Sequence, residues 1–560
     1  MIVDGTCQQK YNPFLATWHE VWNNCDLKRN VDIMSKANAR NHLKIQNPQA
    51  LFTVFGVALF SVILLRNLWI GDDAFISLRV VDNWVHGYGL TWNTSERVQA
   101  FTHPLWLFLI TFFYIIKADP YFTFYASSFI ISVTTVIFLF YRFSPSFQLT
   151  LLGSFLLIGS SAFLDYSSSG LENPLSHLLL LIFLHFGLDK SRQPDLKRLF
   201  WMSLIAGLAA LNRTDTVLFY LPLLVYQWLQ LKGQWGKASA VLFAGFLPII
   251  LWELFSLIYY GFLFPNTFPA KLNTTVSNLV FIQHGIFYIL NSLDWDPVTL
   301  STFFLAAFIT LAKGDVPKKL ALLGGAIYFL YIIWIGGDFM AGRFFSILFL
   351  LSVVLLFTSD LQTQFNLDEP FSFGLTLLLI FLIQINSNAH PILIQADSRS
   401  NNTQNGIANE KLFYYFQSGW LNRWGNFNPP LYGGPEGIQA KQAGKSPIFD
   451  STIGAFGYYA GPDIFIIDPA ALTDPLLARI PYTEFERPGH YIRSLPKGYV
   501  DSFEGEFTNR IQDQYLNAYY NKINIITRGE LFSKERFKTI WELNTGQYDY
   551  LILEYMNGSQ

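Results

Sequence analysis

The fold of this chain is decided by residues 51–79, LFTVFGVALFSVILLRNLWIGDDAFISLR. Apolar residues fill 51–69, which is about the length that a helix needs to cross the hydrocarbon core of a bilayer. Two adjacent carboxylates, Asp72 and Asp73, follow directly. Because charge is costly at that depth, the pair marks either the end of a membrane span or a functional site.

The composition of the whole chain has the same character. Of its 560 residues, 51% are hydrophobic and 14% are charged, whereas an average soluble protein has about 25% charged residues. Lipid is therefore expected to solvate much of the chain. A formal net charge of −2 gives no electrostatic basis for binding nucleic acid. Both cysteines, Cys7 and Cys25, precede the first apolar run, so no disulfide is expected after it.

Long apolar runs predict a polytopic α-helical membrane protein with about eleven transmembrane helices. The runs are 51–69, 121–141, 147–163, 174–188, 199–212, 214–230, 238–260, 298–312, 320–336, 343–358 and 370–386. The apolar segment 103–117 does not fit the alternation of sides, so we predict a juxtamembrane or re-entrant helix there. Segment 280–293 is similar to it.

Basic residues in the connecting loops predict the orientation. Most of the Lys and Arg between spans lie in the loops 189–198, 232–237 and 313–319, which we expect to be cytoplasmic. The basic N-terminal extension, 1–50, is expected on the same side. The polar segments that hold Asp72, Glu172, 265–271 and 338–343 then share the extracytoplasmic face.

The chain is predicted to have two folded parts after the N-terminal extension. The transmembrane domain spans 51–386, and its first external loop is 70–103. From 387 to 560 no further apolar run occurs, which predicts an extracytoplasmic soluble domain. Segments 463–468 and 548–555 indicate strands, and a helix is predicted between them in TNRIQDQYLNAYYNKI, so this domain is expected to be mixed α/β.

The first external loop has the composition of an active site. An aspartate is a favoured N-cap for the helix that AFISLRVVDNW predicts, but a cap needs only one of the two. The same loop holds Arg79, Asn83, Glu96, Arg97 and His103. A membrane enzyme that moves a sugar needs a carboxylate to deprotonate an acceptor hydroxyl, and cations or a metal to hold a phosphate. The residues alone leave cap and active site as equal alternatives.

Two further polar segments are predicted on the same face. In YSSSGLENPLSH, Glu172 and Asn173 occupy a turn, or they contact a sugar or a metal at the bilayer surface. In LAALNRTDTVLFY, Arg213 forms a structural pair with Asp215, or it provides a cation for a lipid-linked phosphate. Both alternatives stay open for each segment.

The last two polar segments combine cations with glycine and proline. YYGFLFPNTFPAKLNT contains Asn266 and Lys271, in a rigid turn or as a phosphate-binding point charge. IGGDFMAGRFF contains Asp338 and Arg343, and the arginine either extends to the interface or binds phosphate. Motifs such as GxxxxGK[ST], GxGxxG after a strand, CxxC and HExxH are missing, which disfavours a nucleotide-powered mechanism in this chain.

A transporter, a flippase or a polymerase of lipid-linked saccharides is the alternative interpretation. A transporter should carry its ionisable residues at mid-bilayer and show repeats between its halves. Here the ionisable residues gather at one predicted face, which favours chemistry there. A polymerase would join preassembled units, and a large external domain is compatible with it.

Segments in order along the chain resemble the GT-C glycosyltransferases related to the mycobacterial terminal arabinofuranosyltransferase AftB. The segments are DDAFISLRVVDNWVHGYGLTWNTSERVQAFTHPLW, SGLENP, LNRTD, FPNTFPAK, GGDFMAGRFF and ALTDPLLARIP. The resemblance covers about 70 to 500 and implies a GT-C fold in a bacterial plasma membrane. It implies an inverting transferase that moves a sugar, with arabinofuranose as a candidate, from a polyprenyl-phosphate donor to a cell-envelope glycan or glycolipid outside the cytoplasm.

The resemblance also implies roles for individual residues. Asp72 or Asp73 is expected to be the catalytic base, and Arg213, Lys271 and Arg343 are expected to bind the donor phosphate. Contacts to sugar or acceptor are expected from Arg79, His103, Glu172, Asn173, Asn266, Asp338 and Asp474. His103 departs from the family, which usually has a Tyr-Thr-Asn/Pro-like run there. An optional Mg²⁺ or Ca²⁺ would have Asp72, Asp73 and Glu172 as ligands, since hard oxygen ligands suit these ions.

The C-terminal part is locally basic, with Arg479, Arg487, His490 and Arg493. Such a domain binds the acceptor glycan, or it packs as a lid on the membrane domain. The sequence favours neither, and it does not identify the sugar, the acceptor or the oligomeric state.

Overall fold

The computed structural model describes most of the chain after the N-terminal extension. The described residues are 48–191, 193–272, 276–359, 361, 365–385, 403–424, 431–444, 446–450, 452–487 and 489–558. Residues 1–47 of the predicted cytoplasmic extension lie outside these ranges. By their contacts, Phe52–Gln560 form one compact unit. The boundary predicted at 387 therefore separates two compositions inside this unit.

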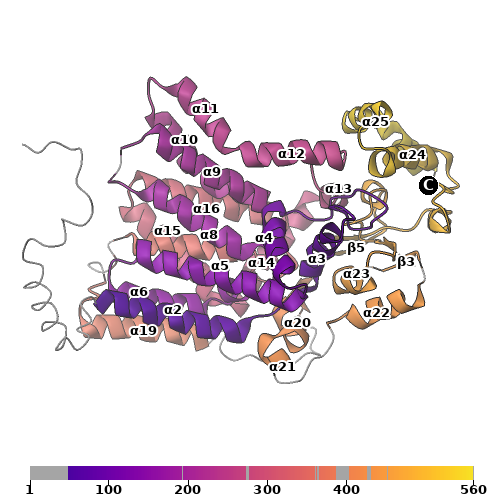
Figure 1. The fold of residues 1–560 in the computed structure, drawn as a ribbon. Coiled ribbons are helices and arrows are strands. Elements are labelled where there is room, and N and C mark those ends of the chain that lie inside the picture. Colours follow the sequence, from indigo (N-terminus) through magenta and orange to yellow (C-terminus); the bar gives the residue numbers. More distant parts are fainter. Residues whose placement is uncertain are drawn as a thin grey trace, which may run out of the picture. The chain divides into compact units, whose positions relative to one another are not determined.

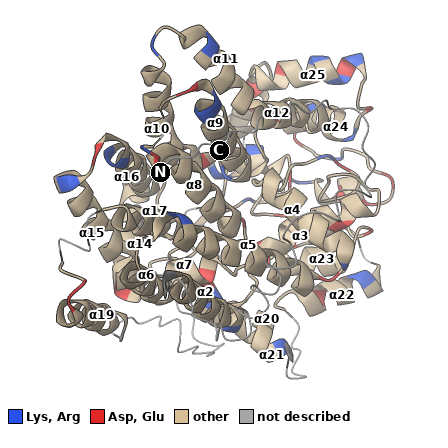
Figure 2. Ribbon diagram, turned by 60° about the vertical axis from the view of Figure 1, so that its left-hand side comes forward, with Lys and Arg blue, Asp and Glu red and all other residues tan. Residues whose placement is uncertain are grey.

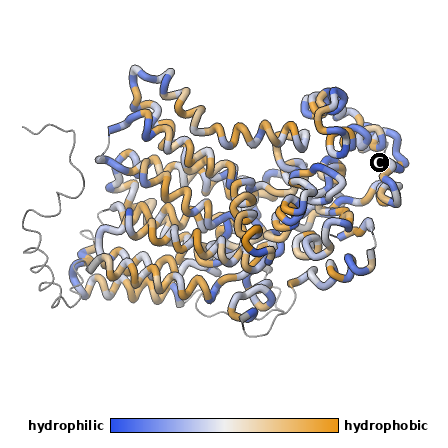
Figure 3. Tube along the Cα trace, viewed as in Figure 1, coloured by the Kyte–Doolittle hydropathy of each residue, from blue (hydrophilic) through white to orange (hydrophobic). Residues whose placement is uncertain are grey.

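Long helices packed side by side form the N-terminal part of the unit (Figure 1). They are α2 (Pro48–Asn67), α3 (Asp72–Val85), α4 (Pro104–Ile116), α5 (Pro120–Phe143), α6 (Phe147–Gly159), α7 (Ser161–Tyr166), α8 (Asn173–Leu188), α9 (Leu196–Asn212), η1 (Thr214–Thr216), α10 (Val217–Gln230), α11 (Trp235–Gly245), α12 (Leu247–Tyr259), α13 (Thr267–Leu272), α14 (Asn278–Trp295), α15 (Pro297–Lys313), α16 (Val316–Trp334), α17 (Phe345–Phe357) and α19 (Pro370–Ile385). Hydrophobic residues run along this bundle, and hydrophilic residues gather at its ends (Figure 3).

Within the described ranges, three helices are each long and apolar enough to cross a membrane: α2, α5 and α16. Two pairs pass this test only together, because α11 and α12 meet at a bend of 54° and α14 and α15 at a bend of 106°. Five shorter apolar helices of 10–17 residues are α4, α6, α8, α17 and most of α19. Every predicted apolar run is thus helical, while the number of about eleven spans stays a prediction.

Side-chain caps and prolines place the helix ends between the apolar runs. Asp119, Asp296 and Asp315 each accept a hydrogen bond from a backbone N–H in the first turn of α5, α15 and α16. A proline follows at the start of each of these helices, where its missing N–H costs no hydrogen bond. Lys, Arg, Asp and Glu are sparse along the bundle and frequent near helix ends (Figure 2). The polar loops of the sequence are therefore also the turns of the bundle.

The C-terminal part of the unit is mainly helical. Its elements are β1 (Thr403–Gln404), β2 (Ile407–Ala408), α20 (Glu410–Ser418), α21 (Trp420–Trp424), α22 (Gly434–Ala443), β3 (Ile448–Phe449), α23 (Ala455–Ala460), β4 (Ile466–Ile467), η2 (Leu477–Arg479), β5 (Glu484–Arg487), β6 (His490–Ile492), η3 (Val500–Phe503), α24 (Gln514–Arg528), α25 (Lys534–Asn544) and α26 (Asp549–Gly558). The strands pair in twos: β1 with β2 and β5 with β6 are antiparallel, and β3 with β4 is parallel.

The secondary structure predicted for this part is right in one segment and wrong in another. The predicted helix is α24, which begins after the cap Asp513. The predicted strand at 548–555 is wrong, because α26 occupies most of it. The C-terminal part has a hydrophobic core of its own, here called the second core, which includes Leu477, Leu516 and Ile523. Tyr548, Leu551, Ile552 and Tyr555 face this core, and their spacing of three and four residues is that of a helix.

The C-terminal part packs against the loops of the bundle. Ala270 of α13 lies in the second core together with residues of η2, α24 and α25. Lys411 of α20 pairs with Asp165 of α7 at 2.6 Å and also contacts Asn67 at the end of α2. The end of the bundle that carries α3 is therefore covered by residues that follow it by hundreds of positions.

Candidate active site

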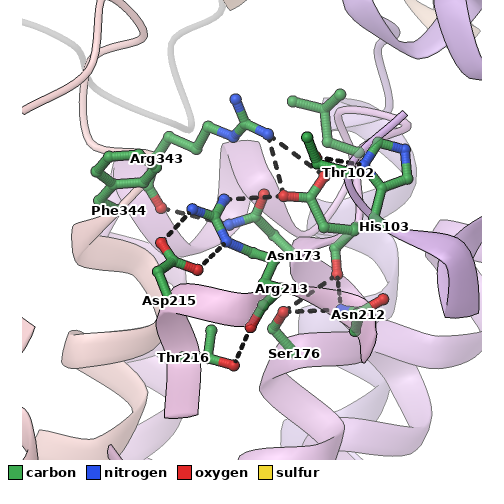
Figure 4. A network of polar contacts seen from close by, with 12 residues as sticks. Thr102, His103, Asn173, Ser176, Asn212, Arg213, Asp215, Thr216, Arg343 and Phe344 are labelled. Carbon is green, nitrogen blue, oxygen red and sulfur yellow. Dashed lines mark hydrogen bonds and ion pairs between the residues drawn. The ribbon is translucent and has the colours of Figure 1, made fainter. Parts of the chain in front are cut away.

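Close contacts join Glu172 to His103, Arg213 and Arg343, and these three partners are labelled in Figure 4. Arg213 Nη1 lies 2.8 Å and Arg343 Nη2 lies 3.0 Å from Glu172 Oε1. His103 Nδ1 is 3.7 Å from Glu172 Oε2. These contacts bring Glu172, Arg213 and Arg343, which the sequence predicted on one face, into one cluster. Glu172 is neither part of a solvated turn nor free to bind a ligand.

The charges of this network are fixed by their surroundings. Only 1% of the Glu172 side chain is exposed. Burial opposes its ionisation, but Arg343 and then Arg213 hold its pKa well below the usual value. In return the pKa of Arg343 is raised: burial would lower it, but Glu172 and Asp338 outweigh that effect. A buried carboxylate between two guanidinium groups therefore stays ionised.

Arg213 matches the structural alternative of its sequence prediction. Its Nε and Nη2 donate to the two carboxylate oxygens of Asp215 at 3.0 and 2.6 Å, while Nη1 donates to Glu172. The guanidinium also lies over the Phe344 ring, 4.7 Å from its centroid. Each nitrogen of the guanidinium group thus donates to a carboxylate of the fold, which is what the structural alternative requires.

Arg343 keeps capacity for a ligand. Its Nη1 is 3.5 Å from Asp338 Oδ2. Within the described residues, Arg343 Nε and Asp338 Oδ2 are buried atoms without a hydrogen-bond partner. Gly337, at φ +72°, lets this loop approach Tyr288, because a Cβ there would lie 2.6 Å from the ring. The loop predicted to bring Asp338 and Arg343 together thus does so, with donor and acceptor groups left over.

The two adjacent aspartates point to different surroundings. Asp72 accepts hydrogen bonds from the backbone N–H groups of Ala455 at 2.8 Å and Gly454 at 3.1 Å. It does not cap α3, whose N-cap is Gly71. Burial raises the Asp72 pKa to about 7, although the Ala455 N–H opposes this. Asp72 is therefore occupied by the C-terminal segment and faces no cation of the network.

Asp73 lies within the electrostatic influence of the network, although no ion pair joins it to another described residue. Burial raises its pKa, and Arg343 and then Lys271 oppose the rise. Asp338 and Glu172 also act on it electrostatically. In the part of the chain that the structure describes, no side chain donates a hydrogen bond to Asp73, which is half-buried. A carboxylate with two nearby cations and no partner is suited to accept a proton from a ligand.

Lys271 reaches the same network from α13. The side chain is exposed, yet protein surrounds it closely enough that desolvation lowers its pKa, against Asp338 and Asp73. Asn266 holds α13 in place: its Nδ2 donates to the carbonyls of Ala471 and Asp474, each at 3.0 Å. Asn266 is therefore a support of the Lys271 helix and not a sugar ligand.

His103 and Asn173 complete the surroundings of Glu172. His103 Nε2 is 2.7 Å from Ser77 Oγ, and burial lowers the His103 pKa to about 4, against the effect of Glu172. His103 is thus neutral at neutral pH. Asn173 Nδ2 donates to the Arg343 carbonyl at 3.3 Å and to Ser346 at 3.2 Å. Both predicted residues are brought to the network, where they contact protein groups.

Arg79 and Asp474 lie outside the network. Arg79 Nε, Nη1 and Nη2 donate to the carbonyls of Trp92, Gly457 and Ile464 at 2.8, 2.5 and 2.9 Å. Asp474 accepts from two backbone N–H groups of η2 and from the Tyr499 hydroxyl. The prediction that they contact sugar or acceptor is wrong for these positions, because all of their polar atoms already bind the fold.

The residues predicted for a divalent metal do not fit one. Two guanidinium groups occupy the Glu172 carboxylate, and two backbone N–H groups occupy Asp72. Among the described residues, no group of three or more His, Cys, Asp or Glu side chains could hold a metal ion. Asp73 alone is left with open coordination, and one carboxylate does not make a site.

Sequence reasoning missed the supports of the network. Asn212 Nδ2 donates to the Glu172 carbonyl at 3.0 Å and to Ser176 at 2.9 Å, and both lie in the polar segments that were singled out. The two segments could be recognised from the sequence, but the hydrogen-bond partners of Asn212 and Ser176 could not. The Gly454 and Ala455 N–H groups on Asp72 have no signal in the sequence, because any residue except proline has such a group.

Known proteins resemble this chain in sequence over most of its length. No protein-family model matches the chain. The terminal β-(1→2)-arabinofuranosyltransferase of Mycobacterium tuberculosis is 24% identical over 75% of this chain and 80% of its own length. The enzyme of the same name from Corynebacterium glutamicum is 25% identical over 65% of this chain and 57% of its own length.

The chain is similar to terminal arabinofuranosyltransferases. The predicted resemblance to these proteins is therefore confirmed. The crystal structure of ArnT from Cupriavidus metallidurans bound to undecaprenyl phosphate superimposes with a TM-score of 0.49 and 12% identity, covering 76% of this chain and 86% of that one.

A conservative change at Arg79 is expected to loosen the C-terminal segment. Arg79→Lys replaces a planar fork that reaches three carbonyls by a single ammonium group, so at least one buried carbonyl loses its donor. We expect a lower melting temperature and faster proteolysis after residue 387, with an unchanged KM for any donor. Protection equal to the wild type would contradict the structural role of Arg79.

Proposed function

We propose that this chain is a membrane glycosyltransferase that acts on the extracytoplasmic side. It moves a sugar, arabinofuranose by similarity to the relatives, from a polyprenyl-phosphate donor to a cell-envelope glycan with inversion at the anomeric carbon. One observation carries the proposal: at the end of an apolar bundle, Arg343 is held by Glu172 and lies beside Asp338, while Arg343 Nε and Asp338 Oδ2 have no hydrogen-bond partner among the described residues. Asp73 is the carboxylate on which Arg343 and Lys271 act electrostatically. The similarity to arabinofuranosyltransferases supports the class of reaction.

The network provides both charges that such a transfer needs. Asp73 takes the proton of the acceptor hydroxyl as its oxygen attacks the anomeric carbon. The bond from that carbon to the phosphate oxygen breaks, and the lipid phosphate leaves with the bonding electrons. Lys271 and the open nitrogen of Arg343 stabilise the phosphate charge. Because a phosphate is a good leaving group, no protonating acid is needed on that side.

The other members of the network hold this arrangement in place. Arg213 and Arg343 meet at one oxygen of Glu172, which fixes the direction of Arg343. Asp338 lies beside Arg343, where its open oxygen can accept from a sugar hydroxyl. The charge of the site is therefore preorganised before a donor enters, and little reorganisation accompanies transfer.

Purified protein in lipid nanodiscs with a panel of polyprenyl-phosphate sugars tests the proposal. Release of polyprenyl phosphate with glycosylation of an added acceptor oligosaccharide, followed by mass spectrometry and NMR of the linkage, is the expected result. Movement of intact lipid-linked sugar across the bilayer without product would favour the transporter. No product from any donor, with a folded and monodisperse protein, would overturn the enzyme.

Lys271 is expected to contribute mainly to donor binding. Lys271→Gln removes the point charge but keeps most of the side-chain length, so the phosphate loses one charge-assisted contact. A contact of this kind is worth about 1.5–3 kcal/mol, or roughly ten- to a hundredfold in affinity. We expect the KM for the donor to rise by about this factor in steady-state assays, while a KM equal to the wild-type value would exclude Lys271 from the phosphate site.

A further inference from the structure

A segment of the C-terminal part lies directly on the start of the helix that carries Asp73. Gly454 N–H and Ala455 N–H donate to the two carboxylate oxygens of Asp72, across 382 and 383 positions of the chain. Asp72 and Asp73 are consecutive residues, so their Cα atoms are about 3.8 Å apart. Whatever holds Asp72 therefore also restrains the backbone from which Asp73 projects.

The fit at this contact depends on the absence of side chains. A Cβ on Gly454 would lie 2.1 Å from the Asp72 carbonyl oxygen and 2.4 Å from its Oδ2. A Cβ on Gly457 would lie 2.8 Å from the Trp92 ring. Gly454 has φ −68°, which any residue can adopt. Glycine is therefore required there by the close approach of α23 to α3.

Further contacts bind the same segment to the first external loop. Arg79 lies about two turns after Asp72 on α3. It donates to the carbonyls of Gly457 and Ile464. Asn93 exchanges two hydrogen bonds with the backbone of Ile466, at 3.0 and 3.1 Å. These groups are all buried, so the loop that bears Asp73 and the segment 453–467 form one rigid piece.

We propose that α23 is a positioning element for the reaction: its Gly454 and Ala455 N–H groups hold Asp72, and through it they aim the Asp73 carboxylate. The inference rests on the proposed function, because it assigns α23 a role in the same proton transfer. It also defines the work of the C-terminal part as neither acceptor binding nor simple cover. Asp72 and Gly454 are positioning residues here and touch no substrate.

Two variants disturb this contact in different ways. Gly454→Ala pushes Asp72 away by steric contact. Asp72→Asn keeps the volume but replaces one carboxylate oxygen by an NH₂ group. That group cannot accept a hydrogen bond, so one of the two backbone N–H groups loses its acceptor. A displacement of about 1 Å at a reacting group costs on the order of 100-fold in rate. We expect kcat to fall by about that factor for Gly454→Ala and by about tenfold for Asp72→Asn, with the donor KM unchanged.

Gly236→Ala is the matched control, because no atom lies within 4 Å of the added methyl group. Its kcat and KM should equal those of the wild type. Hydrogen exchange gives a second readout that does not depend on turnover: the amides at 73–78 should exchange faster in Gly454→Ala and normally in Gly236→Ala. Melting temperature and elution volume confirm that each variant is folded, and Asp72→Asn decides alone if Gly454→Ala does not fold.

The outcomes separate the two proposals. A folded variant with wild-type kcat, or a rise in donor KM in place of a fall in kcat, overturns positioning by α23. An inactive wild type overturns the proposed function and this inference with it. If the wild type is active and Asp73→Asn is inactive while both positioning variants match the wild type, the function stands and the positioning role falls.

Discussion

Asp73→Asn should reduce sugar transfer by roughly 100- to 10,000-fold, the range that a positioned general base contributes. Asparagine keeps the shape of the side chain but cannot accept the proton of the acceptor hydroxyl. Because Asp73 has no hydrogen-bond partner among the described residues, its replacement breaks no contact of the fold. We therefore expect an unchanged melting temperature and an unchanged donor KM, measured with the purified protein and a polyprenyl-phosphate sugar.

Asp82→Asn is the matched control on the same helix. Asp82 lies about two and a half turns further along α3 and accepts a hydrogen bond from Tyr114 at 2.6 Å, outside the ion-pair network. Its replacement should leave transfer close to the wild-type rate. The assignment of the base would be refuted by an Asp73→Asn protein that transfers sugar as fast as Asp82→Asn.

Glu172→Gln should have the largest effect on stability. The change leaves Arg213 and Arg343 as buried positive charges without the carboxylate between them. Removing one partner of a buried ion pair costs about 3–5 kcal/mol, and here two cations lose the same partner. We expect a markedly lower melting temperature in detergent or nanodiscs, together with loss of transfer because Arg343 is no longer held toward the site.

The pH dependence of this effect follows from the lowered pKa of Glu172. A carboxyl group whose folded pKa is depressed stabilises the fold above its unfolded pKa, near 4.5, and this contribution is lost as the pH falls toward the folded value. The difference in melting temperature between wild type and Glu172→Gln should therefore be full at pH 6–7 and shrink below about pH 4.5. Glu436→Gln, at an exposed carboxylate of α22, should show no such difference.

The proposed division of labour between Asp72 and Asp73 corrects the way the pair was interpreted from sequence. Either residue could serve as base as long as only the motif is known. The structure separates them by their partners, since Asp72 accepts from two backbone N–H groups while Asp73 has the cations. By the same reasoning Arg213 is engaged by Asp215 and Glu172, and donors of the fold engage the carboxylates of Asp72 and Glu172.

The sequence by itself determined the apolar helices, and it predicted that the polar loops meet at one end of the bundle. Hydrophobic runs are set by local composition, and the alternation of basic loops places 70–103, Glu172, Lys271 and Arg343 at one end. These are short-range properties, so no knowledge of packing is needed. The helix α26 was misassigned for the opposite reason, because the residues at 548–555 that pack on a core are recognised only once the core that they face is known.

Tertiary structure alone decided which polar residues are free to act. Arg79, Asp474 and Asn266 have the composition of ligand-binding residues, but groups of the fold, most of them backbone carbonyls and N–H groups, contact their side-chain nitrogen and oxygen atoms. Such partners leave no mark in the sequence, since every residue except proline carries the same backbone groups. Burial adds the second reason: a buried polar atom is usually paired, so Arg343 Nε and Asp338 Oδ2, which have no hydrogen-bond partner among the described residues, are atoms that we expect a ligand to contact.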